Sequence, residues 1–239
     1  MLLTKSQLSQ LERELAAGPS GLRTASTSVE CDPLALVRAG APLFGQSTYF
    51  RTPDGDEFAS LGVAVRFSTA GNERFANLEA ELAMLPTMAD GARLTLGFSF
   101  SPQGPSQPEW DGFGACDVSL PKITVVKTGS DAKLVVAVPA GSDPAVTIDI
   151  LADLHRFDDP PPPDPGVHTV ESVPSTIQWQ SEVAEAVGAI RDGSLDKVVL
   201  ARSVQVHSER PTDPFGLVHH LGLANPSCYI YAMVVGESA

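Results

Sequence analysis

The sequence contains little of several features that define whole classes of protein. Its three cysteines, Cys31, Cys116 and Cys228, are odd in number and widely spaced, which excludes a disulfide framework or a zinc site built on paired cysteines. Only 16 lysines and arginines stand against 29 aspartates and glutamates, a net charge of −13, so a basic surface for nucleic acid is not expected. No apolar run reaches the ~18 residues of a membrane span, and the first residues do not form a signal peptide. We therefore expect a cytoplasmic protein with reduced thiols that binds neither nucleic acid nor membrane.

Apolar residues, by contrast, are sufficient for a sizeable core. They make up 43% of the 239 residues, and this length allows one large domain or two smaller ones. Strand-like and helix-like stretches follow one another, which is typical of an α+β or layered α/β architecture. The expected strands are 60–68, 93–101, 122–127 and 132–139, the expected helix is 72–84, and 145–154 is expected to be a helix or a strand.

A proline-rich stretch divides the sequence. Residues 160–163 are four successive prolines, which favour an extended polyproline segment and exclude a helix or a central strand. Such a stretch is either a ligand for a proline-binding partner domain or a surface connection, and the connection is the commoner use. We therefore predict an N-terminal α+β half at 1–157, a connection at 158–170 and a second region at 171–239.

The second region is predicted to begin with an amphipathic helix followed by a strand. Apolar residues recur every three or four positions across 178–190, so one face of this helix is expected to be buried. Ser175 is suited to cap the start of the helix and Gly193 to follow its end. The β-branched residues of 197–206 then predict a strand with Lys197 at its head.

Lys197 allows two interpretations. Alternation along the strand places it on the same face as the small and polar residues Ala201 and Ser203, which suits the lining of a cavity. An amine in a cavity loses hydration, and this lowers its pKa toward the range where it accepts a proton near neutral pH. In the alternative, Lys197 is an edge lysine that reaches water and prevents strand pairing. Periodicity alone favours the edge lysine.

Other candidate sites have weaker support. His219 and His220 are neighbours on a predicted helix at 214–223, so they face different directions and are not expected to clamp a metal ion. Trp110 lies in a turn-rich stretch without a phosphate-binding glycine pattern, and we expect its ring to anchor a loop. A strand is predicted at 229–235. Because no segment follows to form a hairpin with it, this strand is expected to lack a partner.

Several motifs occur in a distinctive order along the chain. The helix pattern from Trp179 to Ile190 leads into Asp196-Lys197-Val198-Val199-Leu200-Ala201-Arg202, and Asn225-Pro226-Ser227-Cys228-Tyr229-Ile230-Tyr231 follows downstream. Upstream stand Thr48-Tyr49-Phe50, Pro53-Asp54-Gly55 and Gly97-Phe98-Ser99-Phe100. Together these motifs resemble the chorismate-binding enzymes, the family of the isochorismate, salicylate, anthranilate and aminodeoxychorismate synthases. The resemblance runs from about residue 34 to residue 239 and implies a layered α/β sandwich.

Within that family, the residue that matches Lys197 separates the chemistries. The resemblance implies that a lysine here is the general base for the water that attacks C2 of chorismate, whereas the ammonia-using branch has glutamine. A neutral amide cannot deprotonate water, but an amine with a lowered pKa can. The implied function is therefore an isochorismate synthase of menaquinone or siderophore biosynthesis. A salicylate synthase, which shares the lysine, is the alternative.

The resemblance also implies residues that the sequence does not contain. The glutamate that acts as general acid, the two glutamates that bind Mg²⁺ and the basic residues that hold the substrate carboxylates belong to segments beyond Ala239. We therefore expect these 239 residues to be the N-terminal portion of a monomeric, Mg²⁺-dependent enzyme, with Lys197 as its one assignable catalytic residue. In an alternative from another class, the chain is a catalytically inactive fragment or an interaction module.

Overall fold

The computed structural model describes the chain except for residues 1–2, 19–20, 108–109, 155–167, 210–211 and 237–239. Most of the predicted connection at 158–170 therefore lies outside the described residues. The chain divides into two compact units, of which the first combines Met1–Pro162 with Asp213–Ala239 and the second is Pro163–Thr212.

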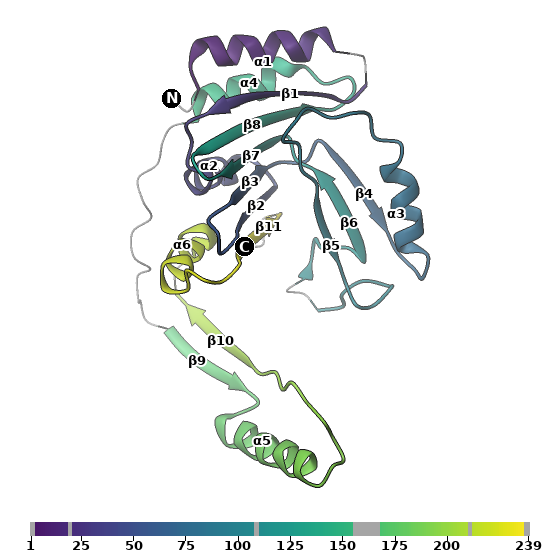
Figure 1. Ribbon diagram of the computed structural model, residues 1–239, viewed down its shortest axis with the longest axis vertical. Helices are drawn as coiled ribbons and strands as arrows, with labels where there is room; N and C mark the ends of the chain where they lie inside the picture. Colours follow the sequence, from purple (N-terminus) through teal and green to yellow (C-terminus); the bar gives the residue numbers. More distant parts are fainter. Residues whose placement is uncertain (1–2, 19–20, 108–109, 155–167, 210–211, 237–239) are drawn as a thin grey trace. The chain divides into compact units, whose positions relative to one another are not determined.

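The first unit contains most of the helices and strands (Figure 1). Its helices are α1 (Lys5–Ala17), α2 (Pro33–Gly40), the 3₁₀ helix η1 (Ala41–Leu43), α3 (Arg74–Leu82), α4 (Pro144–Asp153) and α6 (Pro214–Ala224). Its strands are β1 (Arg23–Val29), β2 (Gln46–Arg51), β3 (Glu57–Leu61), β4 (Val65–Thr69), β5 (Thr95–Phe98), β6 (Cys116–Leu120), β7 (Ile123–Thr128), β8 (Asp131–Val138) and β11 (Ile230–Val235). The second unit contains β9 (His168–Val173), α5 (Thr176–Arg191) and β10 (Ser203–Ser208). Every strand pairing among the described residues is antiparallel, and the predicted α+β class is confirmed.

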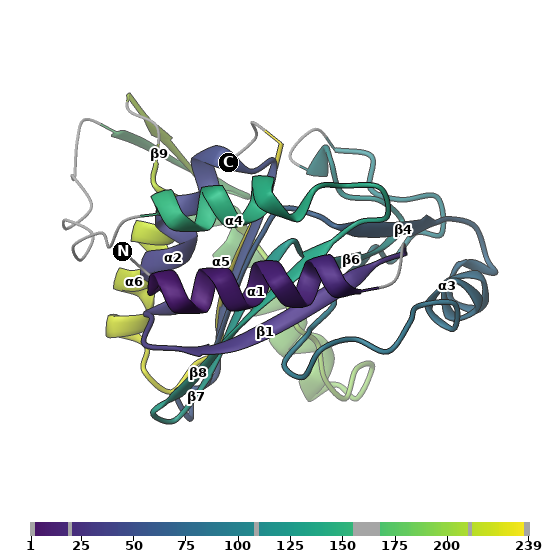
Figure 2. The same ribbon diagram turned by 90° about the horizontal axis from the view of Figure 1, so that it is seen from above.

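A six-stranded sheet in the order β1-β8-β7-β3-β2-β11 is the centre of the first unit. Successive side chains of a strand point to opposite faces, so each strand sends one set of residues to each side. Helices α1, α2, α4 and α6 contribute Leu11, Leu36, Leu151 and Phe215 to one core, in which these side chains are at most 2% exposed. Figure 2 shows α1 and α4 side by side in this helical layer. The residues of the other set, such as Thr48, face away from these helices and line a cleft.

The last strand of the chain completes this sheet. β11 pairs with β2 from Ile230 opposite Arg51 to Val235 opposite Gln46. The prediction that this strand lacks a partner was therefore wrong, because its partner lies far upstream rather than in a following hairpin. This pairing, together with α6, joins residues 213–239 to the N-terminal unit, a grouping that differs from the predicted region at 171–239.

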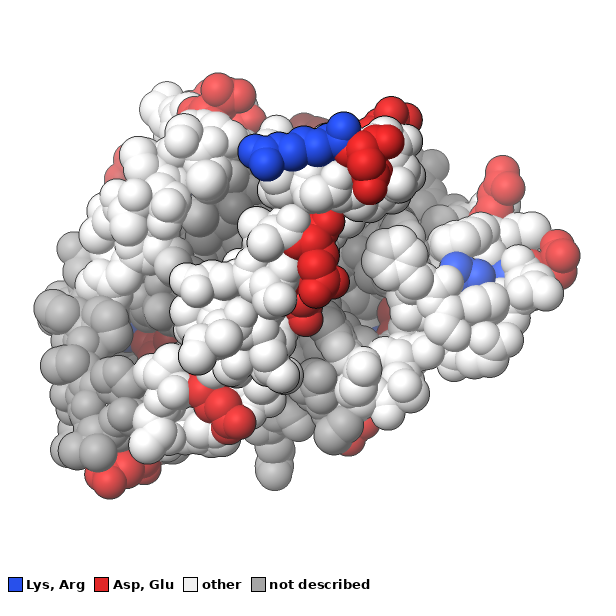
Figure 3. All heavy atoms as spheres, turned by 90° about the horizontal axis from the view of Figure 1, so that it is seen from below, with Lys and Arg blue, Asp and Glu red and all other residues white. Residues whose placement is uncertain are grey.

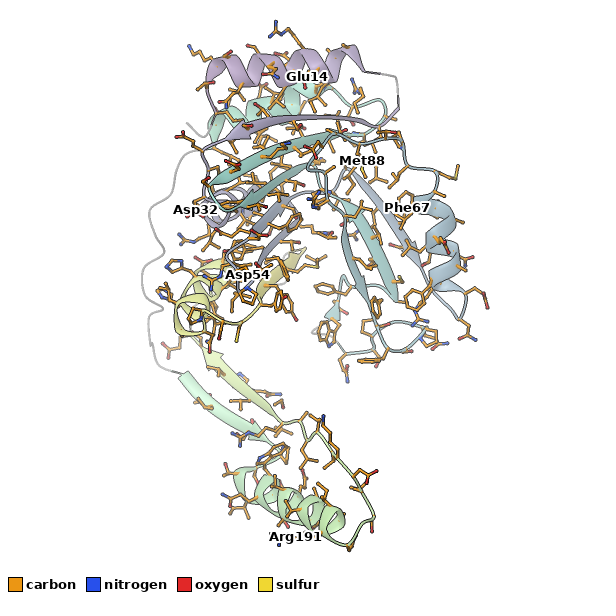
Figure 4. The ribbon with its side chains drawn as sticks, in the orientation of Figure 1. Glu14, Asp32, Asp54, Phe67, Met88 and Arg191 are labelled. Atoms are coloured by element: carbon orange, nitrogen blue, oxygen red, sulfur yellow. The ribbon has the colours of Figure 1, made fainter. Side chains whose placement is uncertain are left out.

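A smaller sheet in the order β4-β6-β5 carries α3. Leu78 of α3 packs with Cys116 and Val118 of β6, and Phe67 of β4 lies against this second core (Figure 4). The single strand predicted at 60–68 was wrong. Gly62 has φ +66°, a conformation that favours glycine, and it turns the chain so that β3 and β4 belong to different sheets.

The remaining predictions for the first unit agree with the structure. Helix 72–84 corresponds to α3, and strands 93–101, 122–127 and 132–139 correspond to β5, β7 and β8. The ambiguous segment 145–154 is helix α4. Asp143 caps its start by accepting a hydrogen bond from the backbone N–H of Ala145 at 2.9 Å, and Pro144 occupies the first turn, where a missing N–H costs nothing.

The carboxylate of Asp213 links the start of helix α6 to α2. Asp213 Oδ1 accepts hydrogen bonds from the backbone N–H groups of Phe215 and Gly216 at 3.0 Å, which caps the helix. Its Oδ2 accepts from Nη2 of Arg38 at 2.8 Å and from Nε at 3.1 Å. Burial alone would raise the pKa of Asp213, but the N–H of Gly216 and the guanidinium of Arg38 outweigh it and lower that pKa.

We expect Asp213→Ala to lower the free energy of unfolding by about 1–2 kcal/mol, chiefly through the lost cap. The ion pair adds little because the Asp213 side chain is 48% exposed.

The lowered pKa of the Asp213 carboxyl also makes the stability depend on pH. A carboxyl group with a lowered pKa stabilises the fold above the ordinary aspartate pKa, and this stabilisation is lost as the pH falls through the folded-state pKa. In urea titrations, the difference between the wild type and Asp213→Asn should therefore shrink below about pH 4. Asp143→Ala, which removes a cap without an ion pair, is the control, and an Asp213→Asn difference independent of pH would contradict this assignment.

The second unit confirms the predicted helix but not its burial. Ser175 and Gln178 form a capping box at the start of α5, and Gly193, with φ +82°, follows its end. No residue of α5 is buried, although a buried stripe was predicted. β10 pairs with β9 from Ser203 to Ser208, so the predicted strand at 197–206 begins six residues later than expected. Residues 197–202 pair with no strand in the described part of the chain, and unpaired backbone does not form a regular strand.

Two helical glycines differ in the space around them, which gives a paired prediction. A Cβ added at Gly40 would overlap Cδ1 of the fully buried Leu61, so Gly40→Ala should cost about 1–3 kcal/mol of stability. A Cβ added at Gly188 of α5 meets no atom within 4 Å, so Gly188→Ala should stabilise its helix by about 0.5–1 kcal/mol. Chemical denaturation followed by circular dichroism measures both effects, and equal effects of the two substitutions would refute the packing argument.

Candidate functional site

Lys197, the predicted catalytic residue, lies on the surface of the second unit. It is exposed and belongs to the irregular segment between α5 and β10. Asp192 stabilises the start of this segment by accepting a hydrogen bond from the backbone N–H of Ser194 at 2.9 Å, and the contacts with Ser194 lower the pKa of Asp192. Within the described residues of this unit, no cavity encloses the amine of Lys197.

The face of α5 that was expected to be buried is open. Val183, Val187 and Ile190 are each about 40% exposed along it, and Figure 4 shows Arg191 at the end of this helix. A shallow hollow of about 440 Å³ lies between α5 and the segment after Lys197. Its lining includes Trp179 and Arg202, whose guanidinium carbon is 5.8 Å from the centre of the indole ring. Arg202 and Trp179 form a cation–π contact at the side of this open hollow. The residues that line the hollow do not include a pair of side chains that could act as acid and base.

A larger concave site than this hollow is a cleft in the first unit, with a volume of about 1110 Å³. One wall is the face of the six-stranded sheet that points away from the helices, where Thr48 of β2 and Met233 of β11 are paired neighbours. The other wall is formed by β5, β6 and the segment between them. This volume slightly exceeds the range of about 300–1,000 Å³ that is usual for small-molecule sites.

Polar side chains form the floor of the cleft. Nε2 of Gln46 donates a hydrogen bond to Oγ of Ser119 at 3.0 Å, and this hydroxyl is 2.7 Å from Oγ1 of Thr95. Nη2 of Arg66 donates to Oε1 of Gln46. Next to this network, the hydroxyl of Thr48 has no hydrogen-bond partner among the described residues, although only 7% of the residue is exposed. A buried hydroxyl without a partner is costly, which makes Thr48 a candidate contact for a ligand.

Aromatic side chains surround the opening of the cleft. Phe98, Trp110 and Tyr231 are all more than half exposed and belong to three different parts of the fold. Trp110 contacts Phe113 edge to face, with ring centroids 5.9 Å apart. Apolar rings of this exposure, grouped around polar groups, are typical of a binding site.

A separate polar cluster lies on the helical side of the sheet, and its side chains form hydrogen bonds with one another. Oε2 of Glu57 accepts from the hydroxyl of Tyr49 at 2.7 Å, and Oε1 accepts from Nζ of Lys127 at 2.9 Å. Burial and the neighbouring Glu57 raise the pKa of Tyr49, and the hydrogen bond to Glu57 raises that of Lys127. Because every charged group here has its partner, we interpret this cluster as structural.

The described residues show neither a cluster of metal ligands nor, on the face in Figure 3, a basic patch for nucleic acid. These residues contain no group of three or more His, Cys, Asp or Glu side chains that could hold a metal ion. The rings of His219 and His220 contact each other edge to face at 5.2 Å. None of the three cysteines forms a disulfide in the structure, and Sγ of Cys31 donates a hydrogen bond to the backbone carbonyl of Asp32 at 3.2 Å. On the described part of the face in Figure 3, acidic side chains are spread out and basic ones are few and separated. None of the described helices is long and apolar enough to cross a bilayer.

Sequence patterns did not indicate the cleft. Gln46 and Arg66 belong to no motif. Thr48 begins the motif Thr48-Tyr49-Phe50, and Trp110 follows Gly97-Phe98-Ser99-Phe100, but these motifs indicated the family and not a cleft. Residues 46–50 read Gln-Ser-Thr-Tyr-Phe, which shows no alternation of polar and apolar residues, so the sequence carried no local signal for this wall of the cleft.

An antiparallel sheet covered by helices on one face, with a cleft on the other, defines an α+β architecture. A family model described as chorismate binding enzyme matches residues 8–239, and the chain belongs to this family. It is 28% identical over 229 residues to a salicylate biosynthesis isochorismate synthase of Pseudomonas aeruginosa, which covers 89% of this chain and 48% of that protein. It is also 31% identical over 71 residues to a putative isochorismate synthase of Aeromonas hydrophila, covering 30% of this chain and 18% of that protein.

The fold has a counterpart among solved structures. MenF, the menaquinone-specific isochorismate synthase from Escherichia coli, superposes with a TM-score of 0.69 at 21% sequence identity, over 97% of this chain and 53% of MenF. This likeness confirms the predicted fold. The chain spans about half the length of the P. aeruginosa relative and of MenF.

Proposed function

We propose that this chain is part of an isochorismate synthase, which converts chorismate to isochorismate. The observation that carries the proposal is the match to the chorismate-binding family over residues 8–239, a range that includes Lys197 within its motif. The name of the P. aeruginosa relative, a salicylate biosynthesis isochorismate synthase, points to the same reaction.

Lys197 is the proposed general base of this reaction. It would take a proton from the water that adds at C2 of chorismate, while the hydroxyl at C4 leaves after protonation by a carboxylic acid. General bases act most effectively when their pKa lies near the working pH, which for a lysine requires loss of hydration. The exposed position of Lys197 in this chain does not supply that desolvation, so the proposal requires further protein to cover the segment from 194 to 202.

The proposal includes Mg²⁺, which would neutralise the substrate carboxylates. The described residues offer no cluster of carboxylates for it, so no residue of this chain is assigned to the ion. It also includes a cytoplasmic, monomeric enzyme acting in menaquinone or siderophore biosynthesis.

Product analysis tests the reaction. A protein of the relatives' length that contains this chain should convert chorismate to isochorismate with Mg²⁺ present, as separated by liquid chromatography. Salicylate as the product would favour the alternative synthase, and an aminated product that forms only with ammonia would refute the role of Lys197. The 239-residue chain, assayed in parallel, is expected to give no product; this outcome fits the alternative of an inactive fragment, and turnover would contradict it.

A further inference from the structure

The segment that carries Lys197 is irregular chain between α5 and β10 (Figure 1). At its start, the backbone N–H groups of Ser194 and Leu195 donate hydrogen bonds to the carbonyl of Ala189 at 2.9 and 3.1 Å, which ties the segment to the last turn of α5. No hydrogen bond in the described part of the chain involves residues 196–201. The backbone around Lys197 therefore has no anchor of its own.

A ring contact holds the other end of this segment. The guanidinium carbon of Arg202 lies 5.8 Å from the centre of the Trp179 ring, which is within the distance of a cation–π contact. We propose that Arg202, through this contact with Trp179, is a positioning residue for Lys197 and holds the segment along α5. The effect on catalysis rests on the proposed function, because Lys197 is a general base only in that reaction.

The segment is longer than the distance between its two anchors. Trp179 lies in the first turn of α5 and Ala189 near its end, so about 15 Å of helix axis separates them. Residues 194–202 could span about 27 Å if they were fully extended. Because of this excess length, the anchor at Ser194 alone leaves Lys197 free to occupy many positions, and a second anchor removes much of that freedom.

The two side chains suit this task. Trp179 is half-buried against the helix and lines the hollow of about 440 Å³ together with Arg202. No ion pair in the described part of the chain includes Arg202, so its planar guanidinium is available to the ring. At an exposed site, a cation–π contact changes the equilibrium between a held and a released segment about 2- to 5-fold.

Cleavage after Lys197 by a lysine-specific endoprotease measures how often the segment leaves α5. When opening and closing are faster than cleavage, the rate follows the population of the open form. In the 239-residue chain, Arg202→Gln and Trp179→Leu should each raise this rate about 2- to 5-fold. Arg191→Gln removes the same charge from the exposed end of α5 (Figure 4) and is the matched control, which should leave the rate unchanged.

Steady-state kinetics tests the consequence for Lys197 in a protein of the relatives' length. Arg202→Gln and Trp179→Leu should each lower kcat for isochorismate formation about 2- to 5-fold, with the KM for chorismate unchanged. Since both side chains act through one contact, the double variant should lose no more than either single variant. Arg202→Lys keeps a cation for the ring and should restore most of kcat.

Several results would overturn the proposal. They are a cleavage rate or a kcat that Arg202→Gln leaves unchanged, and losses of kcat that add up in the double variant. A raised KM with an unchanged kcat would assign Arg202 to substrate binding instead. If the wild-type protein forms no isochorismate, the proposed function fails, whereas the cleavage rates still decide whether Arg202 holds the segment of Lys197.

Discussion

Lys197→Ala, made in a protein of the relatives' length, is expected to lower kcat for isochorismate formation by about 10²–10⁴-fold, the usual contribution of a positioned general base. The fold should be unaffected, because the side chain is exposed in the irregular segment after α5. Steady-state kinetics with chorismate and Mg²⁺, together with circular dichroism of the same sample, measures both expectations.

Two further variants separate proton transfer from charge. Lys197→Arg keeps the positive charge, but a guanidinium does not lose its proton near neutral pH, so this variant should remain inactive. Lys5→Ala, which removes an exposed lysine of α1, should retain full activity. If Lys197→Ala keeps most of the wild-type kcat, the lysine is an edge residue and has no part in catalysis.

Phe215→Ala is expected to have the largest effect on stability, a loss of about 3–5 kcal/mol in the free energy of unfolding. Phe215 is 2% exposed and is part of the core that α6 shares with α1, α2 and α4. Removing the ring leaves a cavity in the layer that holds α6 against β11. Urea denaturation gives the magnitude, and hydrogen exchange should show faster opening of β11.

Leu217→Ala on the same helix is the control. Leu217 is 42% exposed, so its truncation should change stability by no more than about 0.5 kcal/mol. Comparable losses from the two substitutions would mean that α6 is not anchored through Phe215.

Local signals in the sequence predicted α3, α5 and α6 but neither α1 nor α2. Capping residues such as Ser175 and apolar periodicity placed α5 within two residues of its observed ends, and α6 was located in the same way. Long-range pairing was harder to predict. The partner of β11 is some 180 residues upstream, and a single positive φ at Gly62 divides a stretch that reads as one strand. Helix α1 was not predicted, although Leu8, Leu11 and Leu15 recur at spacings of three and four and Thr4 forms a capping box with Gln7 at its start.

The same reason explains why Lys197 was predicted and the cleft was not. Lys197 was identified by a motif within eight consecutive residues, and no local pattern states what covers it. Arg66, Thr48 and Trp110 come from separate parts of the chain and converge only when the two sheets of the first unit have formed. Sequence reasoning found the residue with a contiguous motif and missed the cleft that folding assembles.

Because β11 pairs with β2, the large sheet cannot be completed until the end of this chain has been synthesised. The other five strands of the large sheet are complete by Val138, whereas β11 is synthesised only after Ala224. During that interval the backbone N–H and C=O groups along the free side of β2 have no partner, and such an edge can pair with a neighbouring nascent chain. Ribosomes stalled between residues 139 and 229 should therefore display a chain that chaperones retain, and release should follow the emergence of β11.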